Sequence, residues 1–480
     1  MSRICIVGAG YVGLVSAASF AKLGHDVTCL EVDAGKVASI RRSQLPIREP
    51  HLRPLWQHYQ RTGTLRVTSD YAEAVPGSEF VFLCVGTPSG QNGTVDLRAV
   101  VGAAAGVIEQ LRAADRPIIA IKSTVPVGTV ELVEAIVAGH RRRDRAPQVV
   151  SVPEFLREGH AVDDFLQPSR VVIGARDGAA ARRVAELFGG LDCPVVFCDS
   201  RTAELIKYTS NAFLATKISF INEIAELCES YDVDIAKVAE AVGMDPRIGE
   251  SYLAAGLGWG GSCLPKDLAA LVRMASVQGV SNGLLSSVGR VNKRQPRLIV
   301  DKLRRLLGSF DGVTIAVWGL TFKPDCDDIR ESPALSLIRL LLKEGCAVRA
   351  YDPVAMGSVS SLFPKVCYGA DAYEAAEGSD AIVLATAWRE FQSLDFRRLR
   401  GLVRRPVLLD GRNSLPVAEA TKAGFTLVGV GRSTVAAERR GSVLRVANIG
   451  MPAAPTDGSR PSAGALGVSV FEELIKAELP

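Results

Sequence analysis

The stretch Ile4-Cys5-Ile6-Val7-Gly8-Ala9-Gly10-Tyr11-Val12-Gly13 decides the expected fold of this chain. An apolar run, Arg3–Val7, leads into glycines spaced G-x-G-x-x-G, and small residues then favour a helix through Leu23. In such a strand–turn–helix unit the first glycine makes the tight turn, the second lets a pyrophosphate approach the helix N-terminus, and the third permits close packing of helix on strand. We therefore predict a nicotinamide dinucleotide at this turn, in contact with Gly8, Gly10, Tyr11, Val12 and Gly13.

A carboxylate follows the second predicted strand. Glu31 comes directly after Asp26–Leu30 and lies 31 − 8 = 23 residues beyond Gly8, close to the spacing of about 20 expected for an acid that binds the ribose. A carboxylate there favours NAD, because it would repel the 2′-phosphate of NADP. A secretory signal peptide is the alternative, since Arg3 precedes an apolar run to Phe20. We reject it because glycines interrupt that run and βαβ spacing follows at once.

The composition is that of a large globular protein. The 480 residues are 48% hydrophobic and carry a net charge of +4, which suits about two or three domains. The one basic cluster, Arg141-Arg142-Arg143, is short, so we expect no nucleic-acid partner, and no apolar stretch is long enough to predict a membrane span. Ten scattered cysteines without a C-x-x-C pair indicate a reducing cytoplasm and no metal site or disulfide framework.

Two α/β units are expected, one on each side of a helical segment. Residues 1–195 form the first unit, with strands at 80–85, 118–122 and 148–152 that end in polar groups, where open α/β sheets bind ligands. Residues 301–450 form the second unit, with strands at 313–320, 347–351, 381–385 and 407–410. It lacks G-x-G-x-x-G and is expected to bind something other than a dinucleotide. Residues 451–480, rich in Pro and Gly, are expected to be a flexible tail with a short helix at 468–479.

The central segment, residues 196–300, begins with a helical pattern over 201–231. Lys207 and Asn211 are four residues apart and share one face of this helix. Its apolar side chains include Phe213, Ile218, Ile221, Ile224 and Leu227. The helix is expected to serve either as the spine of a homodimer or as an ordinary core helix. The overall fold predicted is α/β, with two Rossmann-like doubly wound domains joined by this long central helix.

A possible nucleophile lies in Gly258-Trp259-Gly260-Gly261-Ser262-Cys263-Leu264-Pro265-Lys266-Asp267. Glycines let the backbone approach a ligand closely, Lys266 is expected to lower the pKa of the Cys263 thiol, and Asp267 is close enough to handle a water. The alternative is an inert, buried cysteine, which is the commoner state of this residue.

Several motifs occur in order along the chain. Besides the N-terminal fingerprint and the Cys263 segment they are Thr87-Pro88, Ser123-Thr124-Val125-Pro126-Val127-Gly128, Pro153-Glu154-Phe155-Leu156-Arg157-Glu158-Gly159, Lys207-x-x-x-Asn211 and Phe322-Lys323-Pro324…Asp327-Asp328-Ile329-Arg330-Glu331-Ser332. Together they make residues 1–450 resemble the UDP-glucose/GDP-mannose dehydrogenase family. Relatives that act on N-acetylated UDP-sugars have a histidine before the nucleophile and lack Pro-Lys-Asp, so Ser262 and Pro265-Lys266-Asp267 count against that branch.

The resemblance implies oxidation of a sugar C6 alcohol to a carboxylate in two NAD-dependent hydride transfers, which yields a uronate for polysaccharide synthesis. Cys263 would hold the aldehyde as a thiohemiacetal and then a thioester. Lys207 and Asn211 would stabilise oxyanions, and Asp267 would activate water with Glu154 and Thr124 as helpers. The structural alternatives are a surface lysine for Lys207, a packing amide for Asn211, a cap for Glu154, and for Asp267 an N-cap of a helix from Leu268.

The resemblance also assigns binding residues. The cofactor set adds Glu31, Lys36, Thr87, Thr124, Glu158, Lys266 and Arg330 to the glycine turn. The substrate set is Glu154, Phe155, Leu156, Glu158, Lys207, Asn211, Tyr252, Leu253, Gly260, Lys323 and Arg247. Arg247 is expected either to reach a neighbouring subunit or to form a salt bridge within its own chain. Glu31 replaces the more usual aspartate, and Trp259 stands where a smaller aromatic is common.

The substrate remains open between UDP-glucose and GDP-mannose, although the run Trp318-Gly319-Leu320-Thr321-Phe322-Lys323 favours the UDP-glucose branch. A regulator that binds NAD or a nucleotide sugar without catalysis is the alternative from another class. Loss of the nucleophile or its donors would indicate such a regulator, and all of them are present.

Overall fold

The computed structural model describes residues 1–140 and 146–435. The basic cluster at 141–143 and the tail at 451–480, with its expected helix at 468–479, lie outside the described residues. Within the described ranges no helix is both long enough and apolar enough to cross a membrane.

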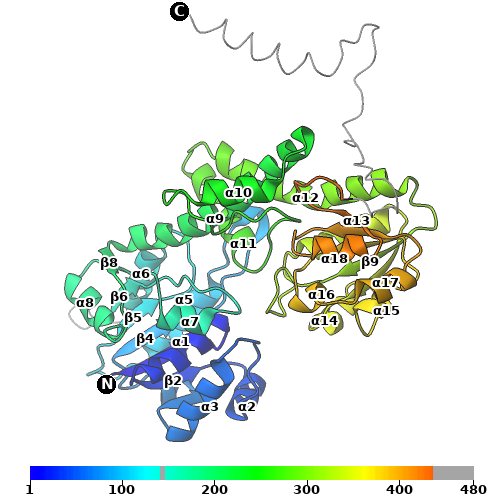
Figure 1. The fold of residues 1–480 in the computed structure, drawn as a ribbon. Coiled ribbons are helices and arrows are strands. Elements are labelled where there is room, and N and C mark those ends of the chain that lie inside the picture. The colour runs from blue at the N-terminus through cyan, green and yellow to red at the C-terminus, as the bar shows by residue number, and fades with distance from the viewer. Residues whose placement is uncertain (141–145, 436–480) are drawn as a thin grey trace, which may run out of the picture. The chain divides into compact units, whose positions relative to one another are not determined.

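The first α/β unit is built on an eight-stranded sheet in the order β3-β2-β1-β4-β5-β6-β7-β8 (Figure 1). Its strands are β1 Arg3–Val7, β2 Asp26–Leu30, β3 Leu65–Thr68, β4 Phe80–Leu83, β5 Ile118–Ile121, β6 Gln148–Ser151, β7 Val171–Gly174 and β8 Val195–Cys198. The first six strands are parallel and have the order of a dinucleotide-binding sheet. The strand β7 then joins β6 antiparallel.

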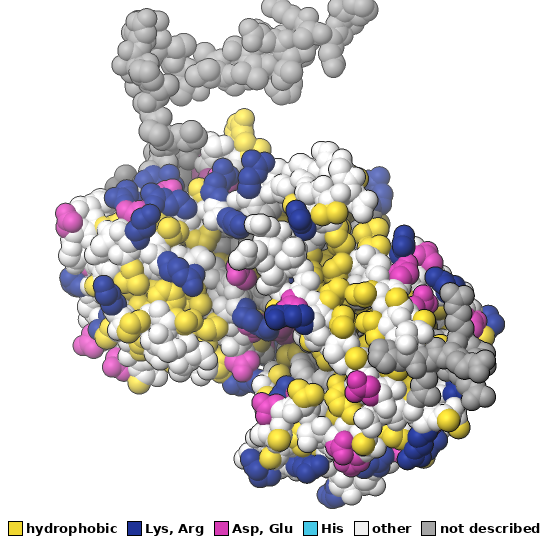
Figure 2. Space-filling view, turned by 180° about the vertical axis from the view of Figure 1, so that it is seen from behind, with side chains coloured by type: hydrophobic (Ala, Val, Ile, Leu, Met, Phe, Trp, Pro, Cys, Tyr) yellow, Lys and Arg dark blue, Asp and Glu magenta, His cyan; other side chains and the backbone are white. Residues whose placement is uncertain are grey.

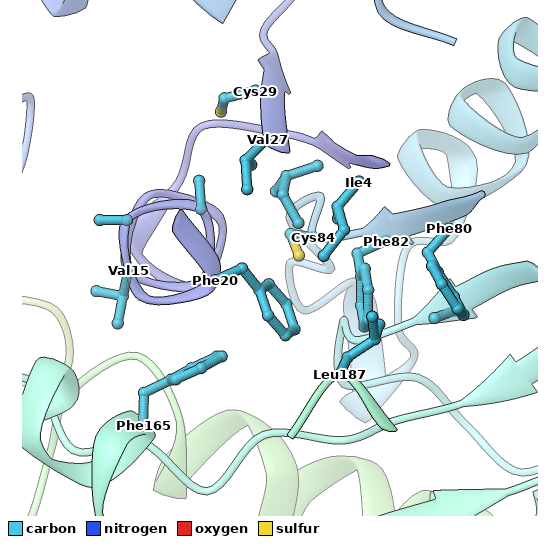
Figure 3. Close-up of a cluster of buried hydrophobic side chains, with 14 of the residues drawn as sticks. Ile4, Val15, Phe20, Val27, Cys29, Phe80, Phe82, Cys84, Phe165 and Leu187 are labelled. Carbon is cyan, nitrogen blue, oxygen red and sulfur yellow. The ribbon is translucent and has the colours of Figure 1, made fainter. Parts of the chain in front are cut away.

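Helices cover both faces of this sheet. One face packs against α1 Tyr11–Lys22, α3 Leu52–Thr62, α7 Ala161–Leu166 and α8 Gly178–Glu186. The other packs against α4 Tyr71–Ala74, α5 Arg98–Gln110 and α6 Thr129–His140. The helix α2 Ala34–Arg41 adds Val37 and Ile40 to the core on the α1 face, and the short helix η1 Gln91–Gly93 lies in a connection. Figure 3 shows Phe20 of α1 pointing between Phe82 of β4 and Phe165 of α7, with ring centroids 5.0 and 5.1 Å away.

The glycine turn is as compact as its spacing predicts. Gly8 has φ +101°, in the left-handed region that glycine tolerates. A Cβ atom on Gly13 would lie 1.8 Å from the carbonyl oxygen of Gly8, so no side chain fits where α1 crosses the turn. The packing of α1 on β1 therefore requires the third glycine of the motif.

The central helix is α9 Ser200–Tyr231, which confirms the helix predicted over 201–231. Its N-terminus is capped by Asp199, whose carboxylate accepts the Thr202 N–H at 2.9 Å. Three more helices follow: α10 Ile235–Gly243, α11 Leu264–Val277 and α12 Gly283–Leu307. Both α11 and α12 pack against α9.

The second α/β unit has a six-stranded parallel sheet in the order β11-β10-β9-β12-β13-β14. Its strands are β9 Thr314–Trp318, β10 Ala347–Tyr351, β11 Cys367–Tyr368, β12 Ala381–Leu384, β13 Val407–Asp410 and β14 Thr426–Val428. Its helices are α13 Pro333–Lys343, α14 Met356–Ser360, α15 Ala372–Ala376, α16 Arg389–Gln392, α17 Phe396–Leu402 and α18 Val417–Lys422. The expected fold, two Rossmann-like units joined by a long helix, is confirmed.

Candidate active site

A cavity of about 890 Å³ lies where the glycine turn, the ends of β4 and β5 and the Cys263 segment meet. Carboxyl ends of parallel strands are where α/β sheets bind ligands, so this position agrees with the expectation from sequence. The predicted residues that line the cavity are Gly10, Tyr11, Val12, Thr87, Thr124, Glu154, Leu156, Glu158, Cys263, Lys266 and Arg330.

Glu31 lies beside the glycine turn at the end of β2. Its carboxylate accepts the Ala9 N–H at 3.1 Å and pairs with the Lys36 ammonium at 2.7 Å. Burial raises the pKa of Glu31, but the hydrogen bonds from Lys36 and from the Asp33 N–H outweigh that effect and lower it. The carboxylate is therefore ionised at neutral pH. Lys36 contacts the same acid that was expected to hold the ribose.

Cys263 occupies the N-cap position of α11, which begins at Leu264. The alternative in which Asp267 caps a helix from Leu268 is therefore wrong, because Asp267 lies inside the first turn of α11. Burial and the nearby Glu154 carboxylate raise the pKa of the Cys263 thiol above its ordinary value, although the Lys207 ammonium acts to lower it, so the expected lowering of this pKa is wrong. Lys207, rather than the expected Lys266, is thus the cation that favours the thiolate.

Lys207 and Glu154 form a buried ion pair next to this thiol. The distance from Lys207 Nζ to Glu154 Oε1 is 3.0 Å, and the two side chains are 4% and 7% exposed. Glu154 also accepts the Leu156 N–H at 2.6 Å. Burial lowers the pKa of Lys207, but Glu154, Cys263 and Asp267 together raise it above its ordinary value. Lys207 is a charged group inside the site and not the surface lysine of the structural alternative.

Asp267 is a second buried carboxylate, 1% exposed. It accepts the Asn211 side-chain amide at 2.6 Å and the Lys266 ammonium at 2.5 Å. Asn211 lies one turn beyond Lys207 on α9, so one helix face contacts both carboxylates. Lys207 and Asn211 share one face of α9, as expected. Each donates to a carboxylate: Lys207 to Glu154 and Asn211 to Asp267.

Glu158 connects three parts of the chain. Its carboxylate accepts the Ser262 hydroxyl at 2.8 Å and lies 3.6 Å from the Arg330 guanidinium, while its backbone carbonyl accepts the Lys323 ammonium. Arg330 also pairs with Asp328 at 2.6 Å. Glu158, in the loop after β6, therefore contacts both the Cys263 segment and the second α/β unit.

Other predicted residues lie outside the 890 Å³ cavity. Phe155 and Tyr252 line a neighbouring cavity of about 340 Å³, together with Leu156 and Glu154. Leu253 is 4% exposed and packs in the apolar core on one face of the second sheet. Arg247 is 87% exposed and pairs with Asp245 of its own chain at 2.6 Å. This is the intrachain salt bridge that was given as the alternative to a contact with a neighbouring subunit. A Cβ on Gly260 would lie 2.2 Å from the Glu331 carbonyl oxygen, so this position holds only glycine.

Sequence reasoning missed residues that complete the site. Lys122, at the end of β5, is buried between the two cavities, and burial lowers its pKa. Arg412, after β13, donates to the carbonyls of Gly258 at 2.7 Å and Ala385 at 2.6 Å, and so holds the segment that leads to Cys263. Both follow strand ends, the same signal that identified Thr124 and Glu154. Within residues 1–140 and 146–435, no group of three His, Cys, Asp or Glu side chains is placed to hold a metal ion.

Comparisons with known proteins agree with this geometry. Residues 2–192, 201–294 and 316–416 match the NAD binding, central and UDP binding domains of the UDP-glucose/GDP-mannose dehydrogenase family. Over 444 residues the chain is 45% identical to UDP-glucose 6-dehydrogenase of Pseudomonas aeruginosa, covering 90% of this chain and 97% of that protein. It is 42% identical to UDP-glucose 6-dehydrogenase TuaD of Bacillus subtilis, covering 91% and 94%. The solved UDP-glucose dehydrogenase of Pyrobaculum islandicum superposes with a TM-score of 0.84 at 39% identity, covering 90% and 98%.

Proposed function

The chain belongs to the UDP-glucose/GDP-mannose dehydrogenase family, and on that premise we propose that it oxidises the C6 alcohol of UDP-glucose to the carboxylate of UDP-glucuronate. One observation carries the proposal. Cys263 and Glu154 line one cavity that also reaches the glycine turn. Lys207 pairs with this Glu154, and Asn211, one turn further along α9, donates to Asp267 in the first turn of α11. A thiol, an ammonium and a buried base beside a dinucleotide site are the groups that a two-step oxidation requires.

The residues of the first α/β unit fit NAD. A Cβ on Gly10 would meet no atom within 4 Å, so the space over the turn is open to a pyrophosphate at the N-terminus of α1. Glu31 presents an ionised carboxylate beside this turn, which suits ribose hydroxyls and repels a 2′-phosphate. Thr87, Thr124 and Arg330 line the same cavity and would complete the cofactor site. When bound, NAD supplies the hydride acceptor for each of the two oxidation steps at C6.

Cys263 would capture the aldehyde that the first oxidation forms. Its sulfur bonds to C6, and the proton of the thiol moves to the carbonyl oxygen, so the thiohemiacetal forms without loss of atoms or charge. Loss of hydride from C6 and of the hydroxyl proton then leaves a thioester on Cys263. The Lys207 ammonium stands beside the sulfur and would stabilise negative charge on the C6 oxygen at each stage.

Water would release the product. We assign the proton acceptor for this water to Asp267, whose two oxygens are held by Asn211 and Lys266. As water attacks the thioester carbon, Asp267 takes its proton and the sulfur leaves as a thiolate; the proton on Asp267 then passes to the sulfur, which restores the Cys263 thiol. Glu154 keeps Lys207 in place and would act as a helper together with Thr124.

A homodimer through α9 is part of the proposal. Apolar side chains gather in patches between charged ones on the molecular surface (Figure 2). On α9 itself the exposed apolar residues include Leu205, Phe213, Phe220 and Leu227, at 44%, 63%, 53% and 52% exposure. Three of them are spaced seven residues apart, as in a helix that packs along a partner.

A cytoplasmic location is proposed because the chain's cysteines are all free thiols.

Absorbance of NADH tests the activity. We expect UDP-glucose to yield about two NADH per sugar and GDP-mannose to yield none above background. Cys263→Ala is the matched control, which should bind UDP-glucose without releasing uronate. Oxidation of GDP-mannose but not of UDP-glucose would identify the chain as a GDP-mannose dehydrogenase. Binding of both ligands without NADH formation would identify the chain as a non-catalytic regulator.

A further inference from the structure

Glu204 is a buried carboxylate on α9 that the proposed mechanism does not use. It is 2% exposed and lies one turn before Lys207. One oxygen accepts the Gly128 N–H at 2.7 Å and the other accepts the Val130 N–H at 2.9 Å. These N–H groups belong to the start of α6, so the side chain of one helix caps another helix that lies 74 residues or more away in the sequence.

The segment that Glu204 holds continues into the cofactor cavity. Residues 123–128 belong to the connection between β5 and α6, and Ser123 and Thr124 line the cavity. On the cavity side the Ser123 hydroxyl donates to the Val85 carbonyl at 2.7 Å, and the Thr87 hydroxyl donates to the Thr124 carbonyl at 2.8 Å. On the opposite side Glu204 anchors the segment to α9. The carboxylate therefore links the cofactor side of the site to the helix that carries Lys207 and Asn211.

We propose that Glu204 is a positioning residue, which fixes the 123–128 segment and its Thr124 relative to the Lys207–Asn211 face of α9. This inference rests on the proposed use of NAD at the glycine turn, but it does not depend on which sugar nucleotide is oxidised. Each carboxylate oxygen serves one N–H, so only the ionised side chain satisfies both donors. A protonated or amide side chain retains a single acceptor oxygen.

Ionisation of the buried Glu204 side chain lowers the stability of the folded protein. Burial raises the pKa of Glu204 to about 7, although the N–H bonds from Gly128 and Val130 act against this rise. Glu131 of α6 also raises it, while Arg201 of α9, paired with Glu131 at 2.6 Å, lies near both acids. Tyr208, one turn further along α9, is a further ionisable neighbour of Glu204, and Asp199 acts on the Arg201 that lies near both acids. Because the pKa of Glu204 in the folded protein is raised from 4.5 to about 7, the free energy of unfolding falls as the pH rises from 4.5 to about 7, and Glu204 causes no further loss above that.

Cofactor binding should depend on pH in the opposite sense. Above pH 7 both N–H bonds form and the segment is fixed. Below pH 7 one oxygen carries a proton, one N–H loses its acceptor, and the Thr124 segment loosens. The wild-type protein should therefore bind NADH more weakly at pH 6 than at pH 8.

The test measures NADH binding by fluorescence and thermal unfolding by calorimetry, both from pH 6 to pH 9 and without a sugar. Glu204→Gln should weaken NADH binding at pH 8 by about 3- to 10-fold, the worth of one such hydrogen bond. The remaining affinity should not change with pH. The same variant should have a higher Tm than the wild type at pH 8, because it buries no charge. If Glu204 were only a structural cap of α6, Glu204→Gln would have a lower Tm than the wild type, and its NADH affinity would still change with pH.

Glu131→Gln is the second variant and keeps the test decisive if Glu204→Gln folds poorly. Glu131 does not line the cavity, and its loss removes a charge that raises the pKa of Glu204. The midpoint of the pH dependence should move to lower pH, with unchanged affinity at pH 9. NADH affinity in Glu204→Gln that equals wild type at pH 8, or a midpoint that stays in place in Glu131→Gln, would overturn the proposal. Absence of NADH binding by the wild type would instead contradict the proposed cofactor site.

Discussion

The two sheets share a strand order but differ at the turn where a dinucleotide would bind. Both place their first strand between the second and the fourth, and each has a glycine with positive φ directly after that strand, Gly8 and Gly319. In the first sheet the turn continues to Gly10, above which there is open space. In the second it continues to Thr321, which is fully buried and whose carbonyl accepts the Thr386 hydroxyl at 2.5 Å.

The acids after the second strand of each sheet differ in the same way. Glu31 is partly exposed beside the cavity. Asp352 is 1% exposed, and its oxygens accept N–H groups that include those of Leu320 at 2.7 Å and the Trp388 indole at 3.1 Å. Glu31 also accepts hydrogen bonds, from Ala9, Asp33 and Lys36, but it is partly exposed and ribose hydroxyls can reach it, whereas they cannot reach the buried Asp352. Strand order alone therefore does not determine the ligand: free space over the turn and an available acid do.

The largest expected effect comes from the nucleophile that serves the first sheet's cofactor. Cys263→Ala should lower uronate formation on the order of 10³-fold or more, because the other thiol that lines the cavity, Cys84, is buried and its burial raises its pKa to about 12. Product analysis by chromatography measures this loss. The matched control is Cys367→Ala, an exposed thiol of the second sheet, which should retain the parent rate. Equal rates for Cys263→Ala and the parent would exclude covalent catalysis.

The next effect separates the two acids. Asp352→Ala should lower the free energy of unfolding by about 3 kcal/mol, since it leaves several buried N–H groups without an acceptor. NADH affinity should stay at the parent value, because the acid serves the fold of the second unit. Denaturant unfolding and NADH fluorescence measure the two quantities. If Asp352→Ala kept the parent stability but bound NADH more weakly, Asp352 would serve cofactor binding and not the fold of the second unit, and the comparison of the two acids would be wrong.

The smallest effect concerns cofactor choice. Glu31→Gln removes the charge that repels a 2′-phosphate and should reduce the preference for NAD over NADP by about 10-fold, equivalent to about 1.4 kcal/mol. The ratio of kcat/KM for the two cofactors measures the change. Asp177→Asn is a suitable control, because Asp177 caps α8 by accepting the Ala179 N–H at 2.8 Å and does not line the cavity. An unchanged ratio in Glu31→Gln would mean that another group selects the cofactor.

Local patterns predicted much of this molecule. The glycine turn, the helix over 201–231 and the strands that end at Thr124 and Glu154 follow from spacing and periodicity within short windows. The partners of charged groups were less accessible, because they come from distant segments. Lys266 was expected to act on the neighbouring thiol but donates to Asp267, and the bond of Glu204 to Gly128 joins segments with no shared motif. The antiparallel entry of β7 also depends on such long-range packing.

The most direct test of the central claim is the behaviour of Asp267→Asn with UDP-glucose and NAD. The claim is that Cys263 carries the sugar as a thioester and that Asp267 is needed to release it. This variant keeps size and hydrogen bonding but removes basicity, which should slow hydrolysis by about 10²–10⁴-fold. A rapid burst of about two NADH per active site should precede a slow steady state, and intact-mass measurement should show a sugar-nucleotide adduct that is missing in Cys263→Ala/Asp267→Asn. Substrate binding with neither burst nor adduct would contradict the account.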